Sequence, residues 1–381
     1  MKYFAKKYYF SSFSNSNLNK INFVEKKDYK SNKDLILLTQ DNSVGDVVVA
    51  SRLLHVLEHN STTNHFDVLC DKKFKIFLDQ FHFKNINIFY CNNVDINHYN
   101  KDYSLDTIDW NKIQFIYNKL NEYNNVYTNQ FFLTIQTNIL LHFIKYKNCI
   151  MFKRAYYKKT NHFIFKIIPC FFTYLWCTSS NVKTPFPLKL FNVINFKKFN
   201  FKFFGNNKCK KLYIQDFIYY SIFKKIPTKS LSSLDLSNYF KINRKNIKQK
   251  SLIIMIDDAR QKRRLKLQCL IDYINAYFPN YNVTFVGNGP KFMKELFNKK
   301  QECKFKIIDK VNKTKTLMDL INEVNKIENV LAYDTSILHI AMLLNKKTTL
   351  IINKKTIHYY SWCKYDNPNL SIIKLNSKYF Y

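Results

Sequence analysis

Glycine is almost absent from this chain, with four residues among 381. Glycine normally makes up about 7% of a protein, so this shortage excludes collagen-like architectures, glycine-rich linkers and glycine-rich repeats. Each glycine that remains is expected at a position where the backbone permits little else. The four are Gly45, Gly205, Gly287 and Gly289.

Acidic residues and arginine are scarce as well. The chain has 27 Asp and Glu against 61 Lys and Arg, a formal net charge of +34, and only six of the basic residues are arginine. Abundant lysine, asparagine, isoleucine and phenylalanine are typical of an A/T-rich genome, so part of this charge reflects composition alone. The positive field still favours anionic partners, namely nucleic acid, phospholipid or a phosphorylated substrate. The apolar content of 46% argues against intrinsic disorder.

Cysteine pairs and long apolar runs are missing too. The nine cysteines include no Cys-x-x-Cys pair, which argues against a zinc ribbon or a redox motif and predicts a reduced, cytoplasmic chain. The first ten residues lack the apolar core and cleavage site of a signal peptide. The most apolar stretch, 167–177, is shorter than the ~20 residues needed to span a bilayer. It is either a buried core segment or one that inserts into a membrane interface.

The chain does contain a repeated alternation of short apolar runs and helical patterns. Continuous apolar runs are typical of parallel strands covered on both faces, and their alternation with helices predicts an α/β fold. The expected strands are 35–39, 66–70, 86–90, 149–152, 252–256, 283–286, 305–308, 330–332 and 348–352. The expected helices are 47–57, 131–144, 265–277, 291–299, 316–324 and 338–344.

Changes in composition divide these elements into two doubly wound, Rossmann-like domains, expected to face a cleft. Residues 1–33 are polar and aperiodic and predict a loose arm, and residues 34–225 form the first α/β domain. The polar stretch 226–250 is the expected linker, and residues 251–381 form the second α/β domain. An alternative for the last segment of the second domain is that it packs against the first domain. Ligands of such sheets bind at the carboxyl ends of the strands.

The turn between the first strand and its helix holds the first candidate site. Within 42–46, Gly45 permits a tight turn, and the helix that follows offers free N–H groups to an anion. Asp46 is a candidate general base toward a hydroxyl group. The alternative is a plain helix cap, a role that aspartate performs well. Arg154, just after the strand 149–152, is a further candidate for binding phosphate or an acceptor.

A second polar turn follows the strand 330–332. Asp334, Thr335 and Ser336 lie in it, where side-chain oxygens and main-chain N–H groups suit phosphate or ribose. His339 comes one helical turn later and can point back toward the same place. The alternative for a lone histidine is a hydrogen-bonded position in the core.

Arginine clusters beside this expected site. Three of the six arginines, Arg260, Arg263 and Arg264, follow the strand 252–256 within five residues. Arginine suits bidentate binding of phosphate, and the alternative is a solvated start of a helix. Gly287 ends the next strand along the chain and marks either the same site or only a turn.

These residues resemble glycosyltransferase family 9, the lipopolysaccharide heptosyltransferases. The resemblance rests on Gly45-Asp46 at the start of a helix and, about 290 residues later, on the pattern D-[ST]-[GS]-x-x-H-x-A at 334–341. The stretch 313–320 is similar to the family's approach to that motif. The similarity extends over roughly 34–370 and is thin in the middle.

The resemblance implies a GT-B fold with an acceptor bound in the first domain and a nucleotide-diphosphate sugar bound in the second. The donor that it implies is ADP-heptose. It implies that Asp46 is the base that activates the acceptor hydroxyl, in an inverting displacement that needs no metal and no other cofactor. The donor contacts that it implies are Asp334, Thr335, Ser336 and His339, and the family's lysine falls near Lys262. Gly287, at a strand end beside the same site, is added to this set.

The implied partners are a nucleotide sugar and an anionic glycolipid such as a lipopolysaccharide core, with no nucleic acid. A monomer is expected, in the cytoplasm or peripherally on the cytoplasmic face of the inner membrane. This surface would suit the basic charge of the chain.

Three departures from the family leave alternatives open. Ser336 stands where glycine is commonest, Arg263-Arg264 replaces a Trp-Pro pair after the lysine, and Arg52 replaces a common helix proline. A degenerate, inactive transferase is therefore one alternative. A basic nucleic-acid-binding protein is another, because lysine with interleaved aromatics also suits such surfaces, although the chain has no recognisable nucleic-acid motif.

Overall fold

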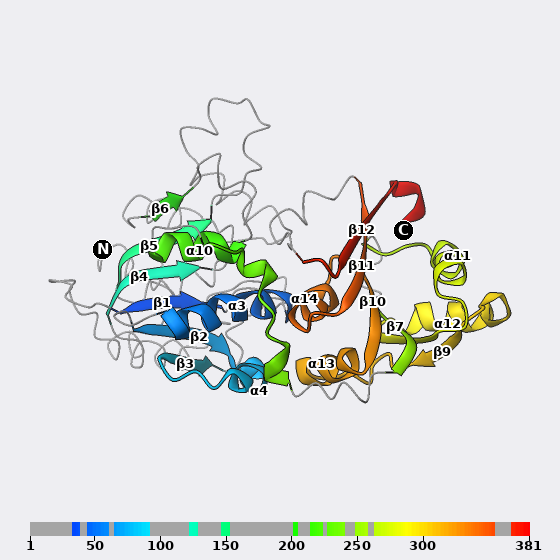
Figure 1. Cartoon of the computed structure of the whole chain (residues 1–381), viewed down its shortest axis with the longest axis horizontal. Coiled ribbons are helices and arrows are strands. Elements are labelled where there is room, and N and C mark those ends of the chain that lie inside the picture. Colours follow the sequence, from blue (N-terminus) through cyan, green and yellow to red (C-terminus); the bar gives the residue numbers. More distant parts are fainter. Residues whose placement is uncertain are drawn as a thin grey trace, which may run out of the picture. The chain divides into compact units, whose positions relative to one another are not determined.

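The structure is a computed structural model of the chain (Figure 1). It describes residues 33–38, 44–60, 65–91, 122–128, 146–152, 201–204, 214–223, 227–240, 248–257, 263–354 and 367–381. Within these ranges no helix is both long enough and apolar enough to cross a membrane. The predicted helix 131–144 and all but the last residue of the predicted arm 1–33 lie outside the described residues.

Contacts divide the chain into two compact units, each with a sheet of its own. The first takes the described residues of 1–42, 57–72 and 83–210, and the second those of 43–56, 73–82 and 211–381. The division of labour between an acceptor domain and a donor domain stays a prediction.

The first sheet has, among the described residues, six parallel strands in the order β3-β2-β1-β4-β5-β6. They are β1 (Asp34–Leu37), β2 (Phe66–Asp71), β3 (Ile86–Cys91), β4 (Tyr123–Thr128), β5 (Tyr146–Phe152) and β6 (Phe201–Phe204). In β1, Asp34 lies opposite Phe66 of β2 and Asn125 of β4. Every residue of β1 and β2 is buried, as their apolar runs predicted.

Three aspartates are buried in this sheet, namely Asp34, Asp67 and Asp71, and β4 supplies hydrogen bonds to the first two. Asp34 Oδ1 accepts from the main-chain N–H of Asn125 at 3.0 Å and from its side-chain amide at 2.9 Å. Asp67 Oδ2 accepts from the Tyr123 hydroxyl at 2.7 Å. Burial and the nearby Asp34 carboxylate raise the pKa of Tyr127. The polar residues of β4 therefore satisfy carboxylates that would be costly to bury alone.

Seven helical segments precede β7 (Lys248–Asp257) in the described part of the chain. They are α3 (Val44–Asn60), η1 (Lys72–Phe74), α4 (Lys75–Leu78), η2 (Asp79–Phe81), α10 (Ile214–Phe223), η6 (Leu231–Ser233) and η7 (Ser237–Phe240). The described part of the predicted linker, 227–240, is packed rather than extended. Leu231, Leu236 and Phe240 are buried there, and Asp216 of α10 accepts the Leu231 N–H at 2.6 Å.

The second sheet also has six parallel strands among the described residues, in the order β12-β11-β10-β7-β8-β9. They are β7 (Lys248–Asp257), β8 (Asn282–Asn288), β9 (Lys306–Asp309), β10 (Ile327–Ala332), β11 (Lys347–Asn353) and β12 (Leu370–Leu375). The helical segments are α11 (Leu267–Tyr277), α12 (Pro290–Asn298), η10 (Lys300–Glu302), α13 (Leu317–Asn325), α14 (Ser336–Leu343) and η11 (Ser377–Tyr379). Figure 1 shows α11 and α12 on one face and α13 and α14 on the other.

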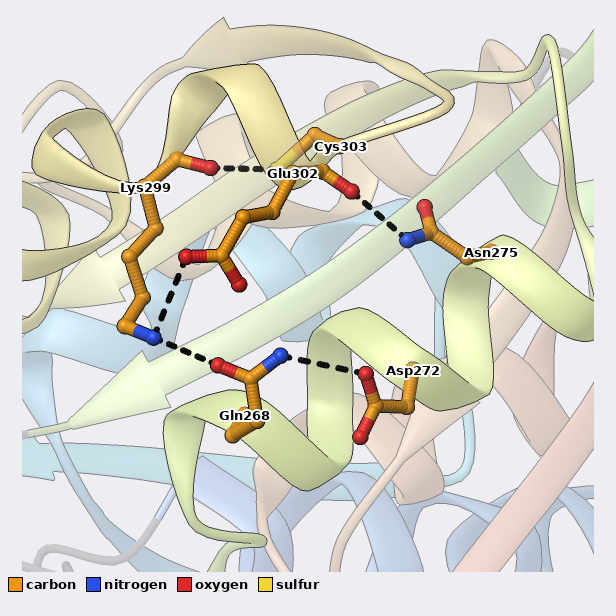
Figure 2. A network of polar contacts seen from close by, with 6 residues as sticks. All are labelled: Gln268, Asp272, Asn275, Lys299, Glu302 and Cys303. Carbon is orange, nitrogen blue, oxygen red and sulfur yellow. Dashed lines mark hydrogen bonds and ion pairs between the residues drawn. The ribbon is translucent and has the colours of Figure 1, made fainter.

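Local chemistry accounts for where these helices begin. Pro290 opens α12 directly after Gly289, a position where the missing N–H of proline costs nothing. Thr316 caps α13 in a capping box with Asp319, each side chain accepting the other's main-chain N–H. The polar contacts between Gln268, Lys299 and Glu302 then hold η10 against α11 at the surface (Figure 2).

The predicted α/β fold with two doubly wound parallel sheets is confirmed. Three strands were not predicted, namely β4, β6 and β12. β4 is rich in polar residues and pairs beside a buried acid, β6 has four residues at a sheet edge, and β12 is an edge strand with no fully buried residue. The extended form of each therefore depends on pairing with a distant strand.

Candidate functional site

The hydroxyl of Thr335 is a buried polar group of the predicted donor site. Thr335 is the residue before α14, and its N–H donates to the carbonyl of Tyr333 at 2.7 Å. Its side chain does not cap the helix, and its Oγ1 has no hydrogen-bond partner among the described residues although the residue is only 8% exposed. Buried hydroxyls are nearly always paired. This oxygen and the N–H groups of the first helical turn are therefore suited to a phosphate or a sugar hydroxyl.

Ser336 is the first residue of α14, and its hydroxyl is turned toward the neighbouring strand. Ser336 Oγ lies 3.3 Å from the sulfur of Met255 in β7, as donor to it. The hydroxyl that glycine would lack is therefore directed at an apolar strand residue. Sequence alone singled out Ser336 but not Met255, because the two are 81 residues apart.

Asp334 is joined to the arginine cluster. Arg263 Nη1 donates to the main-chain carbonyl of Asp334 at 2.9 Å and lies 3.8 Å from its carboxylate. The arginine side chain is half-exposed, so the ion pair is screened and weak. Arg263 nevertheless places a guanidinium at the turn that precedes α14.

His339 lies one turn into α14 and is buried. Burial, and secondly the positive charge of Arg52, lower its pKa to about 3. The imidazole is therefore neutral near pH 7, with one nitrogen that donates and one that accepts. It can offer a hydrogen bond to a ligand but no positive charge.

The sequence marked Arg52 only as a replacement for a common helix proline, and its burial and its contact were not predicted. It is fully buried in α3, and its Nε donates to the Leu234 carbonyl at 3.2 Å. The sequence feature that could have indicated it is the single arginine within the apolar helix pattern of 47–57, because a charged residue is rarely buried unless it has a polar partner.

Asp46 and Gly45 lie in the first turn of α3, where Gly45 is buried and Asp46 is half-buried. A carboxylate at this place is stabilised by the helix dipole. Contacts group residues 43–56 with the second unit, which also holds α14. The roles of Asp46 as a base or as a cap both stay predictions.

The two glycines at the carboxyl end of β8 are required by a neighbouring strand. Gly287 has φ +100°, and a Cβ there would lie 2.3 Å from the Ile256 carbonyl oxygen. At Gly289 a Cβ would lie 2.8 Å from Ile256 Cγ2. The two glycines thus allow the carboxyl ends of β7 and β8 to approach closely. This steric role accounts for both residues whether or not Gly287 contacts a donor.

Solved structures with a similar fold include several sugar transferases. The chain matches "E. coli heptosyltransferase WaaC with ADP" with a TM-score of 0.57 and 11% identity, over 91% of this chain and 94% of that one. It matches the glycosyl transferase family 9 protein from Veillonella parvula with a TM-score of 0.54 and 13% identity, over 90% and 86%. E. coli ADP-heptose lps heptosyltransferase II follows with 0.52 and 10%, over 90% of each chain. The fold is that of the family 9 heptosyltransferases.

The heptosyltransferase-like GT-B fold agrees with the resemblance drawn from the sequence. At 10–13% identity it shows the fold alone. No protein family model and no curated protein sequence matches the chain.

Around the start of α14 the structure brings together Asp334, Thr335, Ser336 and Arg263, with His339 on the next turn. Three predicted site residues, Lys262, Arg154 and Arg260, lie outside the described residues. Among the described residues, no group of three or more His, Cys, Asp or Glu is arranged to hold a metal ion.

Arg264 differs from what its cluster predicted. Its guanidinium carbon lies 4.6 Å from the Phe292 ring centroid and 5.0 Å from that of Tyr381, and the residue is buried. Of the two arginines of this cluster that the structure describes, Arg263 thus contacts the polar turn and Arg264 contacts aromatic rings.

Proposed function

We propose that this protein is an inverting, metal-independent glycosyltransferase that moves heptose from ADP-heptose onto a lipopolysaccharide core or a related glycan. The observation that carries the proposal is the buried hydroxyl of Thr335 at the start of α14, which has no hydrogen-bond partner in the part of the chain that the structure describes. Its position at the carboxyl ends of the parallel strands is where such sheets bind nucleotides. Solved structures of the same fold contain ADP and ADP-2-deoxy-2-fluoro heptose.

The donor diphosphate would lie at the first turn of α14. The N–H groups there, the Thr335 hydroxyl and the guanidinium of Arg263 supply hydrogen bonds and positive charge to the departing diphosphate. Neutral His339 supplies a hydrogen bond without charge. These groups would take the part that a metal ion plays in other transferases.

Asp46 would act on the acceptor. Its carboxylate takes the proton of the acceptor hydroxyl as that oxygen attacks the anomeric carbon. The new glycosidic bond forms as the bond to the diphosphate breaks, on the opposite face of the sugar, so the configuration inverts. The base and the donor contacts thus belong to different helices, α3 and α14.

The basic charge of the chain supports an anionic acceptor. A net charge of +34 attracts phosphate-bearing glycolipids and the anionic cytoplasmic face of the inner membrane. We place the protein in the cytoplasm or peripherally on that face, as a monomer.

The decisive experiment compares nucleotide binding with transfer. ADP and ADP-heptose are expected to raise the melting temperature of the wild-type protein more than UDP- or GDP-sugars do, because a ligand stabilises the state that binds it. Asp46→Asn is expected to keep that stabilisation and to lower kcat by at least about 100-fold. Asp272→Asn, an exposed aspartate on α11, is the control and should leave kcat unchanged.

Two outcomes would contradict the proposal. Normal turnover by Asp46→Asn would remove the assigned mechanism. Salt-sensitive binding to generic RNA with no response to any nucleotide sugar would favour the nucleic-acid-binding alternative.

A further inference from the structure

The last five residues described pack beside the turn that carries Arg263. Phe380 is buried and pairs with Leu265 in an antiparallel bridge. The N–H of Lys266 donates to the carbonyl of Tyr379 at 2.9 Å. The segment Ser377–Tyr381, which we call the tail, therefore lines the turn 263–266 along its main chain.

The tail also contacts a buried charge in that turn. The guanidinium of Arg264 contacts two aromatic rings, with its carbon 4.6 Å from the ring centroid of Phe292 in α12 and 5.0 Å from that of Tyr381 in the tail. A cation close to two rings is attracted by both, and more strongly where water is excluded. Arg264 is only 5% exposed, whereas Tyr381 is 43% exposed.

The same turn is joined to the predicted donor site in two ways. Arg263, next to Arg264, donates to the Asp334 carbonyl at 2.9 Å. Tyr333, which precedes Asp334, belongs to the hydrophobic cluster that also contains Leu265 and Phe380. A shift of the turn would therefore move both the guanidinium and the strand end from which α14 starts.

We propose that the tail is a positioning element of the donor site, in which Tyr381 and Phe380 hold the turn 263–266 so that Arg263 reaches Asp334. The inference rests on the proposed function for the identity of its ligand. It assigns no contact with substrate to the tail itself. Tyr381 acts through Arg264 and Arg263.

The contacts separate this role from general stability. Tyr381 is too exposed to contribute much to the core, and its described ring contact is to Arg264. Lys378 lies in the same tail but over the ring of Tyr379, so Lys378→Ala is a control in the same segment. Tyr381→Phe keeps the ring that faces Arg264, and Tyr381→Leu keeps apolar volume without a π face.

The test measures ADP affinity by calorimetry and amide hydrogen exchange over 263–270. Tyr381→Ala is expected to weaken ADP binding about tenfold and to speed exchange at the Lys266 amide, while peptides from β7 and β10 exchange as in the wild type. Tyr381→Phe and Lys378→Ala should match the wild type, and Tyr381→Leu should fall between. Arg263→Ala should weaken ADP binding by a similar factor, and the double variant Arg263→Ala/Tyr381→Ala should be no weaker than the worse single variant.

The proposal is overturned if Tyr381→Ala binds ADP as the wild type does, or if the losses of the two single variants multiply in the double variant. Failure of the wild-type protein to bind ADP would instead refute the proposed function. The role of the tail would then be decided by comparing the hydrogen-exchange rate of the Lys266 amide in Tyr381→Ala with the rate in Tyr381→Phe. Equal rates in the two variants would overturn the role of the tail.

Discussion

At the scale of single residues, Gly287 and Gly289 mark places with no room for a side chain. Gly287 combines a φ of +100° with a Cβ position 2.3 Å from a neighbouring carbonyl oxygen. Either feature alone disfavours every other residue. The scarcity of glycine was visible in the sequence, but the neighbour that requires Gly287, Ile256, was not.

Gly287→Ala is expected to lower the free energy of unfolding by at least about 2 kcal/mol, because it adds both backbone strain and a clash with main chain. Urea denaturation followed by circular dichroism measures the change. Asn288→Ala, at the exposed next position, is the control and should change stability by less than about 0.5 kcal/mol. Equal stability of Gly287→Ala and the wild type would show that the strand ends do not approach as closely as described.

His339 gives a prediction on pH. Its pKa is lowered from 6.5 to about 3 in the folded protein, so below pH 6.5 the unfolded chain binds a proton that the folded chain does not. Stability therefore falls as the pH falls from 6.5 toward 3, by about 1.4 kcal/mol at a pH near 5.5 for this residue alone.

Urea denaturation of the wild type and of His339→Gln at several values from about pH 8 to about pH 4.5 checks this, because the range spans the unfolded-state pKa of 6.5. The variant should lose less stability on acidification than the wild type does. His65→Gln, at an exposed position, should retain the wild-type slope. An unchanged slope in His339→Gln would mean that the histidine is not held neutral.

At the scale of elements, helix α3 depends on a buried arginine rather than on its apolar face alone. Arg52 binds the Leu234 carbonyl, and His55 Nδ1 lies 3.1 Å from the Tyr239 hydroxyl. Both partners come from the packed segment 227–240. Helix α3, whose first turn carries Asp46, is therefore held by a segment that the sequence predicted to be part of a linker.

Arg52→Met should leave the Leu234 carbonyl without this donor and loosen α3, at a cost of about 1–3 kcal/mol. If Asp46 is the base, kcat should fall about tenfold while ADP affinity stays close to that of the wild type, because burial, the larger cause, still keeps His339 neutral and the contacts at the start of α14 remain. Arg52→Lys retains a donor and a charge and should recover part of the loss. Steady-state kinetics with calorimetry of ADP binding separates the two effects, and a loss of ADP affinity with unchanged kcat would contradict the assignment.

At the scale of the whole molecule, the charge of +34 carries a prediction that no single residue does. Binding to vesicles that contain phosphatidylglycerol should be clear at about 0.1 M NaCl and largely lost by about 0.5 M. The reason is that the distance over which charges attract is about 10 Å at 0.1 M salt and becomes shorter as salt is added. Co-sedimentation measures it, with phosphatidylcholine vesicles as the control. Equal binding to both vesicles, or binding indifferent to salt, would contradict a peripheral location driven by charge.

The sequence by itself determined the alternation of strands and helices, the fold class and the turns that hold Asp46 and Asp334. These features are local, because an apolar run or a polar turn is encoded by adjacent residues. Strand β4 could not be found in this way. Its tyrosines and asparagine are strand residues because Asp34 and Asp67, far away in the chain, need their hydrogen bonds.

Only the tertiary structure decided which of the candidate residues share a site and which serve the fold. Two adjacent arginines have opposite roles, since Arg263 reaches Asp334 and Arg264 is enclosed by Phe292 and Tyr381. The buried Arg52 and the tail likewise acquire their meaning from partners distant in sequence. Burial and contact are set by the packing of the whole unit, and a pattern of neighbouring residues cannot encode them.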